Sequence, residues 1–216
     1  MARVKPKSKS KPKSQVQEYL EALVSAGLLT LFLQAFFVQA FRIPSESMLD
    51  TLLVGDFLFV NKLEYGPRIP FTHFRLPGYR KPHPGDVIVF DWPPDPSKQF
   101  IKRCVAVGGE TVEIRRKNLW VDGRERNFPQ AHHVDPSEHP EGSDPRDNYR
   151  APTVPPGCLF MMGDNRDNSL DSRFWGPVDM GLVQGHAMFI YFSTSGDQWW
   201  NGLFNIRFDR MFRPIH

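Results

Sequence analysis

The sequence predicts a mainly β protein: an antiparallel β-sheet or barrel-like domain with a β-rich insertion, preceded by one N-terminal transmembrane helix. The 216 residues include 20 Pro and 16 Gly, and 13% are aromatic, which suits a turn-rich sheet better than a helical bundle. Short apolar runs separated by turn residues recur after residue 55, and none suggests a βαβ unit. One long apolar run, from Ala22 to Phe41, precedes them and predicts the helix.

Residues 1–14 form a basic tail that we expect to lie in the cytoplasm. Residues 1–13 carry six cationic side chains and no acid, so the rest of the chain has a net charge of −3, against +3 for the whole. A nucleic-acid-binding surface on the folded part is therefore poorly supported. A disordered solubilising end is one alternative. Cationic residues before an apolar segment favour a role in membrane topology instead.

Residues 15–41 are predicted to be a membrane anchor helix. The apolar run is long enough to span roughly 30 Å of hydrocarbon as a helix. Two glutamines interrupt it, which is tolerable near an interface. The positive-inside rule then places the rest of the chain on the exported side. Two alternatives remain, a core helix of a soluble protein and a cleavable signal peptide, for which Val38-Gln39-Ala40 loosely supplies a small-x-small site.

Residues 42–216 are predicted to be one exported β domain, with residues 111–156 as a hairpin-and-loop insertion. The predicted strands are 55–62, 85–90, 99–107, 158–162 and 186–193, and the predicted hairpin pairs 111–114 with 119–121. Residues 64–84 are rich in Pro, Gly and His, and residues 124–153 hold several Pro, His and acidic groups and little apolar surface, so we expect loops in both segments. The two cysteines, Cys104 and Cys158, either pair in an oxidising compartment or remain free buried thiols.

The first candidate site block is Pro44-Ser45-Glu46-Ser47-Met48, directly after the apolar run. Serine alone is a poor nucleophile, so the chain must supply a base. No Gly-x-Ser-x-Gly turn surrounds Ser47, which argues against a hydrolase built on that motif. The alternative is a loop whose serines cap a helix.

Lys102 is the best candidate base. In a strand it shares one face with Phe100, Cys104 and Ala106, and it is the only charged group on that face. Such a lysine must reach solvent, pair, or lose its proton. A neutral amine near pH 7 is a competent general base. A strand-edge lysine that reaches solvent is the alternative.

The third block runs from Gly163 to Arg173 and is dense in polar groups that could orient the other two. A plain polar turn is one alternative. A calcium loop is another, but the glycine and terminal glutamate that such a loop needs are missing. The histidines at 132, 133 and 139 have no matched ligands around them in the sequence, so no metal is predicted.

Together and in this order, the serine block behind an anchor, Lys102-Arg103 before Gly108-Gly109-Glu110, and the Gly163 block resemble type I signal peptidase, or leader peptidase. The resemblance extends from about Phe41 to the C-terminus. It implies a Ser/Lys-dyad serine endopeptidase that removes signal peptides from exported preproteins at the outer face of the bacterial inner (cytoplasmic) membrane. It implies no cofactor. The chain departs from the family at Asp50, where proline is usual.

The resemblance also implies roles for individual residues. Ser47 is the expected nucleophile and Lys102 its base, while the Ser45 hydroxyl and the Ser47 backbone N–H form the oxyanion hole. Ser169 is expected to hold the lysine amine, with Asp171 and Arg173 as a bracing ion pair and Gly163 as a point of close backbone approach. The implied walls of the substrate pockets are Phe41, Ile43, Met48, Leu52, Phe100 and Ile101.

The expected partners are preproteins with small residues at −1 and −3, which enter as an extended strand. The lipid bilayer and the secretion translocon are further expected partners, and nucleic acid is not. Two other functions stay open. One is a specialised Ser/Lys processing peptidase of the pilus or conjugation type, and the other is an inactive, membrane-tethered β module that binds exported chains.

Overall fold

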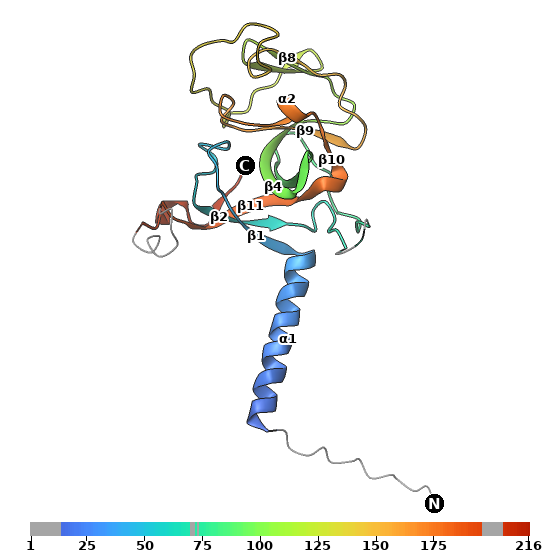
Figure 1. Cartoon of the computed structure of the whole chain (residues 1–216), viewed down its shortest axis with the longest axis vertical. Helices are drawn as coiled ribbons and strands as arrows, with labels where there is room; N and C mark the ends of the chain where they lie inside the picture. Colours follow the sequence, from blue (N-terminus) through green and yellow to red (C-terminus); the bar gives the residue numbers. More distant parts are fainter. Residues whose placement is uncertain (1–13, 70–71, 73, 196–204) are drawn as a thin grey trace, which may run out of the picture.

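A computed structural model describes residues 14–69, 72, 74–195 and 205–216. The predicted basic tail therefore lies outside the described residues, except for Ser14. Figure 1 shows one long helix, α1 (Gln15–Phe36), projecting from a β-rich body at the side where β1 lies. The insertion lies at the opposite end of this body, around β8.

Helix α1 begins at a capping box. The Gln17 N–H donates to the Ser14 hydroxyl and the Ser14 N–H donates to the Gln17 side chain, which satisfies two free donors of the first turn. None of its residues is buried in the body, so its apolar side chains face outwards all round. Within the described part of the chain, it is the one helix long and apolar enough to cross a membrane.

The predicted anchor is too long at its C-terminal end. The helix ends at Phe36, and β1 (Val38–Arg42) pairs antiparallel with β2 (Asp56–Asn61). The apolar run continues through this junction, so hydropathy does not mark it, whereas Val38 and Phe41 fit a half-buried strand well. Lys62 closes the helix end, since its N–H donates to the Phe37 carbonyl (2.9 Å) and its ammonium to the Gln34 carbonyl (2.8 Å).

The main sheet is antiparallel throughout and has the order β1-β2-β11-β3-β4-β9-β10, with β12 paired to β11. Its other strands are β3 (Val87–Trp92), β4 (Asp95–Val107), β9 (Cys158–Met162), β10 (Val178–Asp179), β11 (Val183–Ser193) and β12 (Arg213–Pro214). The short helices are α2 (Ser172–Trp175), η1 (Met180–Leu182) and η2 (Phe208–Arg210). The five strands predicted outside the insertion correspond to β2, β3, β4, β9 and β11.

The insertion has its own four-stranded sheet, in the order β7-β6-β5-β8. These strands are β5 (Val112–Arg115), β6 (Asn118–Val121), β7 (Arg124–Glu125) and β8 (Tyr149–Arg150). The predicted hairpin is β5–β6, but residues 124–153 are not only loop, because they supply β7 and β8. Strands of two residues are too short to show a period in the sequence. The inner face of this sheet packs in one cluster with Val105 and Phe160, which joins it to β4 and β9.

Strand β4 contains a bulge at Val105, a short distance after Lys102. Cys104 faces Met161 and Ala106 faces Phe160, so Val105 is an extra residue on β4. Cys104 packs in a cluster against which Phe100 also packs, whereas Val105 and Ala106 both pack under the insertion. The predicted face therefore ends at Cys104, and Ala106 does not belong to it. Cys104 and Cys158 are both free thiols.

Candidate active site

Ser47 lies in the loop that joins β1 to β2, and backbone hydrogen bonds hold the two ends of this loop together. The Ile43 N–H donates to the Asp56 carbonyl (2.9 Å) and the Gly55 N–H to the Ile43 carbonyl (3.0 Å), which closes the base of the loop. Met48 and Leu52 are fully buried in the core. Ser47 itself is 8% exposed, so its hydroxyl is held at the edge of the body.

The structure places Lys102 of β4 against this serine. Its Nζ lies 2.5 Å from Ser47 Oγ, and the side chain is buried. Burial lowers the pKa of Lys102 to about 8, with a smaller lowering by Arg173 and an opposing effect of the Asp171 and Asp164 carboxylates. A substantial fraction of the amine is therefore neutral near pH 8, as a general base requires.

Ser45 and Asn165 both contact the segment that contains Ser47. The two hydroxyls of Ser45 and Ser47 lie 3.5 Å apart, so Ser45 is close enough to face the same substrate atom. The Asn165 N–H donates to the Ser47 carbonyl (3.2 Å), and its side-chain amide donates to the Glu46 carbonyl (3.3 Å). Asn165 thus fixes the backbone that presents Ser47, a role the sequence did not reveal.

Residues 163–173, here called the catalytic loop, approach Ser47 through Gly163. A Cβ added at Gly163 would lie 2.3 Å from Ser169 Oγ and 2.4 Å from the Ser47 carbonyl oxygen. Both are shorter than any tolerable carbon contact, so the approach leaves no room for a side chain. The Gly163 N–H donates to Asp171 Oδ2 (3.1 Å).

Asp171 and Arg173 form a buried bidentate ion pair, in which Arg173 Nε and Nη2 each lie 2.8 Å from a carboxylate oxygen. Burial opposes ionisation of Asp171, but the charge and hydrogen bonds of Arg173 outweigh it and lower the pKa of the carboxyl. Asp171 also caps α2 by accepting from the Arg173 N–H. The buried Ser169 hydroxyl lies beside Asp171 and contributes to this lower pKa, but it makes no hydrogen bond to Lys102.

A second buried ion pair lies on the opposite face of β4. Arg103 Nε and Nη2 each donate to Asp164 at 2.7 Å, and the Thr51 hydroxyl donates to the same carboxylate (2.6 Å). The pairing of Asp164 with Arg103 was not predicted from the sequence. The sequence did contain a signal for this pair. Lys102 and Arg103 are adjacent cations in an apolar strand, so their side chains point to opposite faces and each needs a compensating group.

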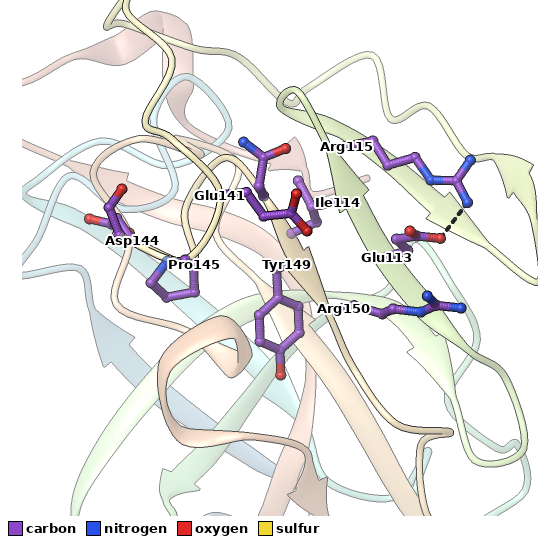
Figure 2. Close-up of a pocket in the computed structure, with 11 residues that line it drawn as sticks. Glu113, Ile114, Arg115, Glu141, Asp144, Pro145, Tyr149 and Arg150 are labelled. Atoms are coloured by element: carbon purple, nitrogen blue, oxygen red, sulfur yellow. Dashed lines mark hydrogen bonds and ion pairs between the residues drawn. The ribbon is translucent and has the colours of Figure 1, made fainter.

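The six predicted pocket residues belong to two packing clusters. Ile43, Met48 and Leu52 are core residues, and Phe41 and Ile101 pack partly exposed against them. Phe100 packs against the other cluster, with its ring centroid 5.5 Å from Lys102 Nζ and stacked on Trp92 at 5.2 Å. A separate cavity of about 580 Å³ lies in the insertion, and none of its lining residues belongs to the predicted site (Figure 2).

Comparison with known proteins decides the family. The model of the family described as signal peptidase, peptidase S26, matches residues 16–192. The chain belongs to the signal peptidase family. Signal peptidase I of Pseudomonas aeruginosa is 37% identical over 192 residues, which cover 77% of this chain and 67% of that relative. The probable signal peptidase I-1 of Synechocystis is 36% identical, over 83% of this chain and 84% of that relative.

The chain spans 62% of a third relative, signal peptidase I of Pseudomonas fluorescens, which is 38% identical over 73% of this chain. A crystal structure of a signal peptidase I from Enterococcus faecalis is 29% identical, with a TM-score of 0.42 over 50% of this chain and 97% of that one. Membership of the signal peptidase family makes the chain a serine peptidase. The predicted family and enzyme class are therefore confirmed, and the inactive β module is not favoured. Together with α1, membership indicates a membrane-anchored signal peptidase.

Proposed function

We propose that this chain removes N-terminal signal peptides from exported preproteins, with Ser47 as nucleophile and Lys102 as general base. The contact between a buried lysine and the serine hydroxyl, 2.5 Å long, is the observation that supports these roles. The test is to incubate purified protein with a preprotein and to sequence the N-terminus of the product. A matched preprotein with a bulky residue in place of the −1 alanine should remain uncut.

In the proposed reaction, the neutral Lys102 amine takes the proton of Ser47 as its oxygen bonds to the scissile carbonyl carbon. The resulting ammonium gives that proton to the leaving amine as the peptide bond breaks, which leaves an acyl-enzyme. Water then attacks the ester, with the amine again as base, and Ser47 is restored. Asp171 and Asp164 favour the ammonium form, while burial favours the neutral form, so the base can cycle between them.

We further propose that the oxyanion is bound by the Ser45 hydroxyl and the Ser47 N–H. Replacing Ser45 with alanine should lower kcat roughly 100- to 1000-fold, because one donor is lost and the dyad remains. KM should change little, since the donor acts on charge that develops in the transition state. Ser45→Thr keeps a hydroxyl and serves as the rescue variant. An unchanged kcat for Ser45→Ala would remove the residue from this role.

The substrate is proposed to bind as an extended strand beside the dyad. Phe41 and Ile101 are only partly buried, so they have surface free to contact the side chains of a peptide. Beneath them Ile43, Met48 and Leu52 already fill the core, which leaves shallow sites suited to small residues at −1 and −3. Phe100 would bound the other side of the scissile bond.

The proposed location is the bacterial inner membrane, with residues 1–14 in the cytoplasm and residues 42–216 on the exported side, within reach of the translocon. Protease added to spheroplasts should digest the exported domain and leave the N-terminal tail protected. Epitope tags at each end, detected by blotting, report the two fragments. Digestion of the N-terminal tag in intact spheroplasts would reverse the proposed orientation.

A further inference from the structure

We propose that the insertion holds the catalytic loop in position, and that Asp167 is the positioning residue through which it acts. This inference rests on the proposed function, because it assigns the insertion a part in the same reaction. Asp167 belongs to the catalytic loop, whereas its partners belong to the insertion.

A backbone contact first joins the two segments. The His132 N–H donates to the Asp164 carbonyl (2.9 Å), and the Arg166 N–H donates to the His132 carbonyl (3.0 Å), which forms a parallel bridge at Asn165. The Asn165 N–H in turn donates to the Ser47 carbonyl. The insertion is therefore separated from the nucleophile's backbone by one residue of the catalytic loop.

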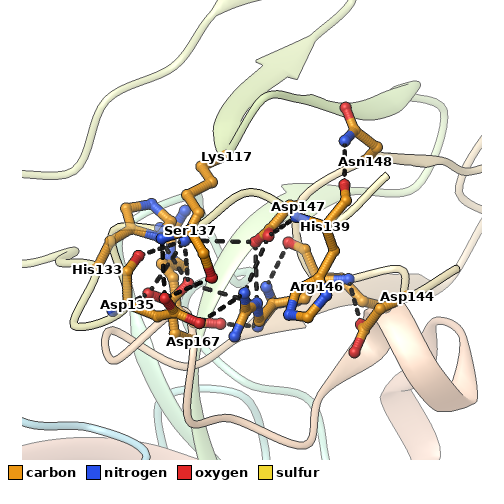
Figure 3. Close-up of polar contacts among 12 residues, drawn as sticks. Lys117, His133, Asp135, Ser137, His139, Asp144, Arg146, Asp147, Asn148 and Asp167 are labelled. Atoms are coloured by element: carbon orange, nitrogen blue, oxygen red, sulfur yellow. Dashed lines mark hydrogen bonds and ion pairs between the residues drawn. The ribbon is translucent and has the colours of Figure 1, made fainter. Parts of the chain in front are cut away.

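The Asp167 carboxylate is contacted by side chains and a backbone N–H of the insertion (Figure 3). Its carboxylate lies 3.2 Å from Lys117 Nζ and 2.9 Å from His133 Nδ1, and it accepts the Asp135 N–H at 2.8 Å. The Asp167 side chain is 1% exposed. Burial opposes ionisation of Asp167, but these hydrogen bonds outweigh it, the one with His133 most strongly. They lower the pKa of the Asp167 carboxyl to about 2. Arg146 Nε, 3.7 Å away, adds a second cation.

A second connection reaches the far end of the loop. Asp147 is fully buried between Arg146 Nε (3.0 Å) and Lys117 Nζ (3.7 Å), and Arg146 also pairs with the Asp135 carboxylate (3.1 Å), so one network of ion pairs joins Asp147 and Asp167. The Arg146 carbonyl accepts a hydrogen bond of 2.9 Å from Arg173 Nη1, and Arg173 pairs with Asp171. The insertion thus holds the catalytic loop near both of its ends.

The position of this loop matters because it carries Asp164, Asp171 and Arg173, whose charges act on Lys102. Gly163 of the loop also touches the Ser47 backbone. A displacement of about 1 Å in a reacting group can cost roughly 100-fold in rate. The same displacement would admit water to Lys102, whose neutral form depends on burial.

The test is Asp167→Asn in the full-length protein, which keeps the shape of the side chain and removes its charge. We expect kcat to fall roughly 10- to 100-fold, with KM within about threefold. The rising limb of kcat/KM should move to higher pH, because burial is the largest influence on Lys102 and water would weaken it. Loss of folded protein alone would lower the rate at every pH and leave the limb in place.

Lys117→Gln probes the same contact from the insertion side and should shift the limb in the same direction. The loss in the double variant should be smaller than the product of the two single losses, because the two changes share the Lys117–Asp167 contact although each also removes others. Lys117→Gln also gives the answer if Asp167→Asn does not fold. The matched control is Glu113→Gln, whose side chain pairs with Arg115 on the same strand of the insertion (Figure 2), and it should keep the parental kcat and limb.

Two outcomes would overturn the inference: a parental kcat and pH limb in the folded Asp167 and Lys117 variants, or a slower rate with an unmoved limb. Neither outcome contradicts the proposed function as long as the Ser47→Ala variant is inactive. Undiminished cleavage by Ser47→Ala would contradict the proposed function instead, so the two failures are distinguishable.

Discussion

Replacing Ser47 with alanine is expected to abolish preprotein cleavage, with kcat falling by roughly a million-fold, as when the nucleophile of a serine protease is removed. The physical reason is that no other hydroxyl lies in hydrogen-bond contact with Lys102 Nζ within the part of the chain that the structure describes. The Ser45 hydroxyl, 3.5 Å from Ser47 Oγ, is an oxyanion donor in our proposal and not a substitute nucleophile. Single-turnover cleavage, followed by the appearance of the mature N-terminus, measures the effect.

The matched control for this variant is Ser97→Ala. Ser97 is exposed in the β3–β4 hairpin, where its hydroxyl donates to nearby Asp95, so its loss should leave the rate unchanged. Thermal unfolding of both variants should stay close to that of the parent protein, because each change removes one oxygen. Residual turnover by Ser47→Ala above roughly one-thousandth of the parental rate would assign the nucleophile elsewhere.

Replacing Lys102 with methionine is expected to have the second largest effect, a loss of roughly 10⁴-fold or more in kcat. Methionine has a similar length and an apolar end, so it fills the buried space but cannot accept the serine proton. In the parent protein, the rising limb of kcat/KM should have its midpoint near the lowered pKa of Lys102, about 8. If Lys102→Met keeps the parental limb, another group deprotonates Ser47, and His132 is the first to test.

The same substitution should make the protein more stable at neutral pH. The unfolded chain binds the lysine proton up to its ordinary pKa of 10.5, whereas the folded protein releases it near 8. Burying the charged form therefore costs the parent up to about 3 kcal/mol below pH 8. This cost disappears as pH rises from 8 to 10.5, and so should the advantage of Lys102→Met. Chemical unfolding at pH 7 and pH 10.5 checks the sign, and a variant less stable at pH 7 would contradict it.

The parts of the site that sequence could predict are those whose chemistry is local. Residue type and alternation along one strand make Ser47 and Lys102 candidates, the resemblance to type I signal peptidase implies their roles, and the structure brings them together. The Asp171–Arg173 pair is likewise implied by the resemblance, which a motif of two nearby residues can carry. Arg103 and Asp164 are 61 positions apart in the chain, so no hydrophobic period or motif spacing predicts that they pair.

The parts that sequence missed depend on contacts that carry no periodic signal. The bulge at Val105 changes which face Ala106 occupies, although the apolar pattern of β4 continues through it. The end of α1 is hidden because Phe36 and Val38 are both apolar. The many polar residues of 124–153 predict a surface loop, yet Asp147 of this segment is buried in ion pairs, as is the side chain of Asp167 in the catalytic loop.

Only Phe37 separates α1 from β1, and Lys62 bonds the last carbonyls of the helix to the end of β2. We therefore expect the sheet to follow any tilt or rotation of the helix in the lipid. We also expect the short path from the end of α1 to set the height of Ser47 above the bilayer. We expect such a junction to select the scissile bond by its distance from the membrane as well as by the side chains around it. Flexible residues inserted at Phe37 should allow cleavage at additional bonds without changing the dyad, and an unchanged set of cleavage positions in that variant would contradict this selection by depth.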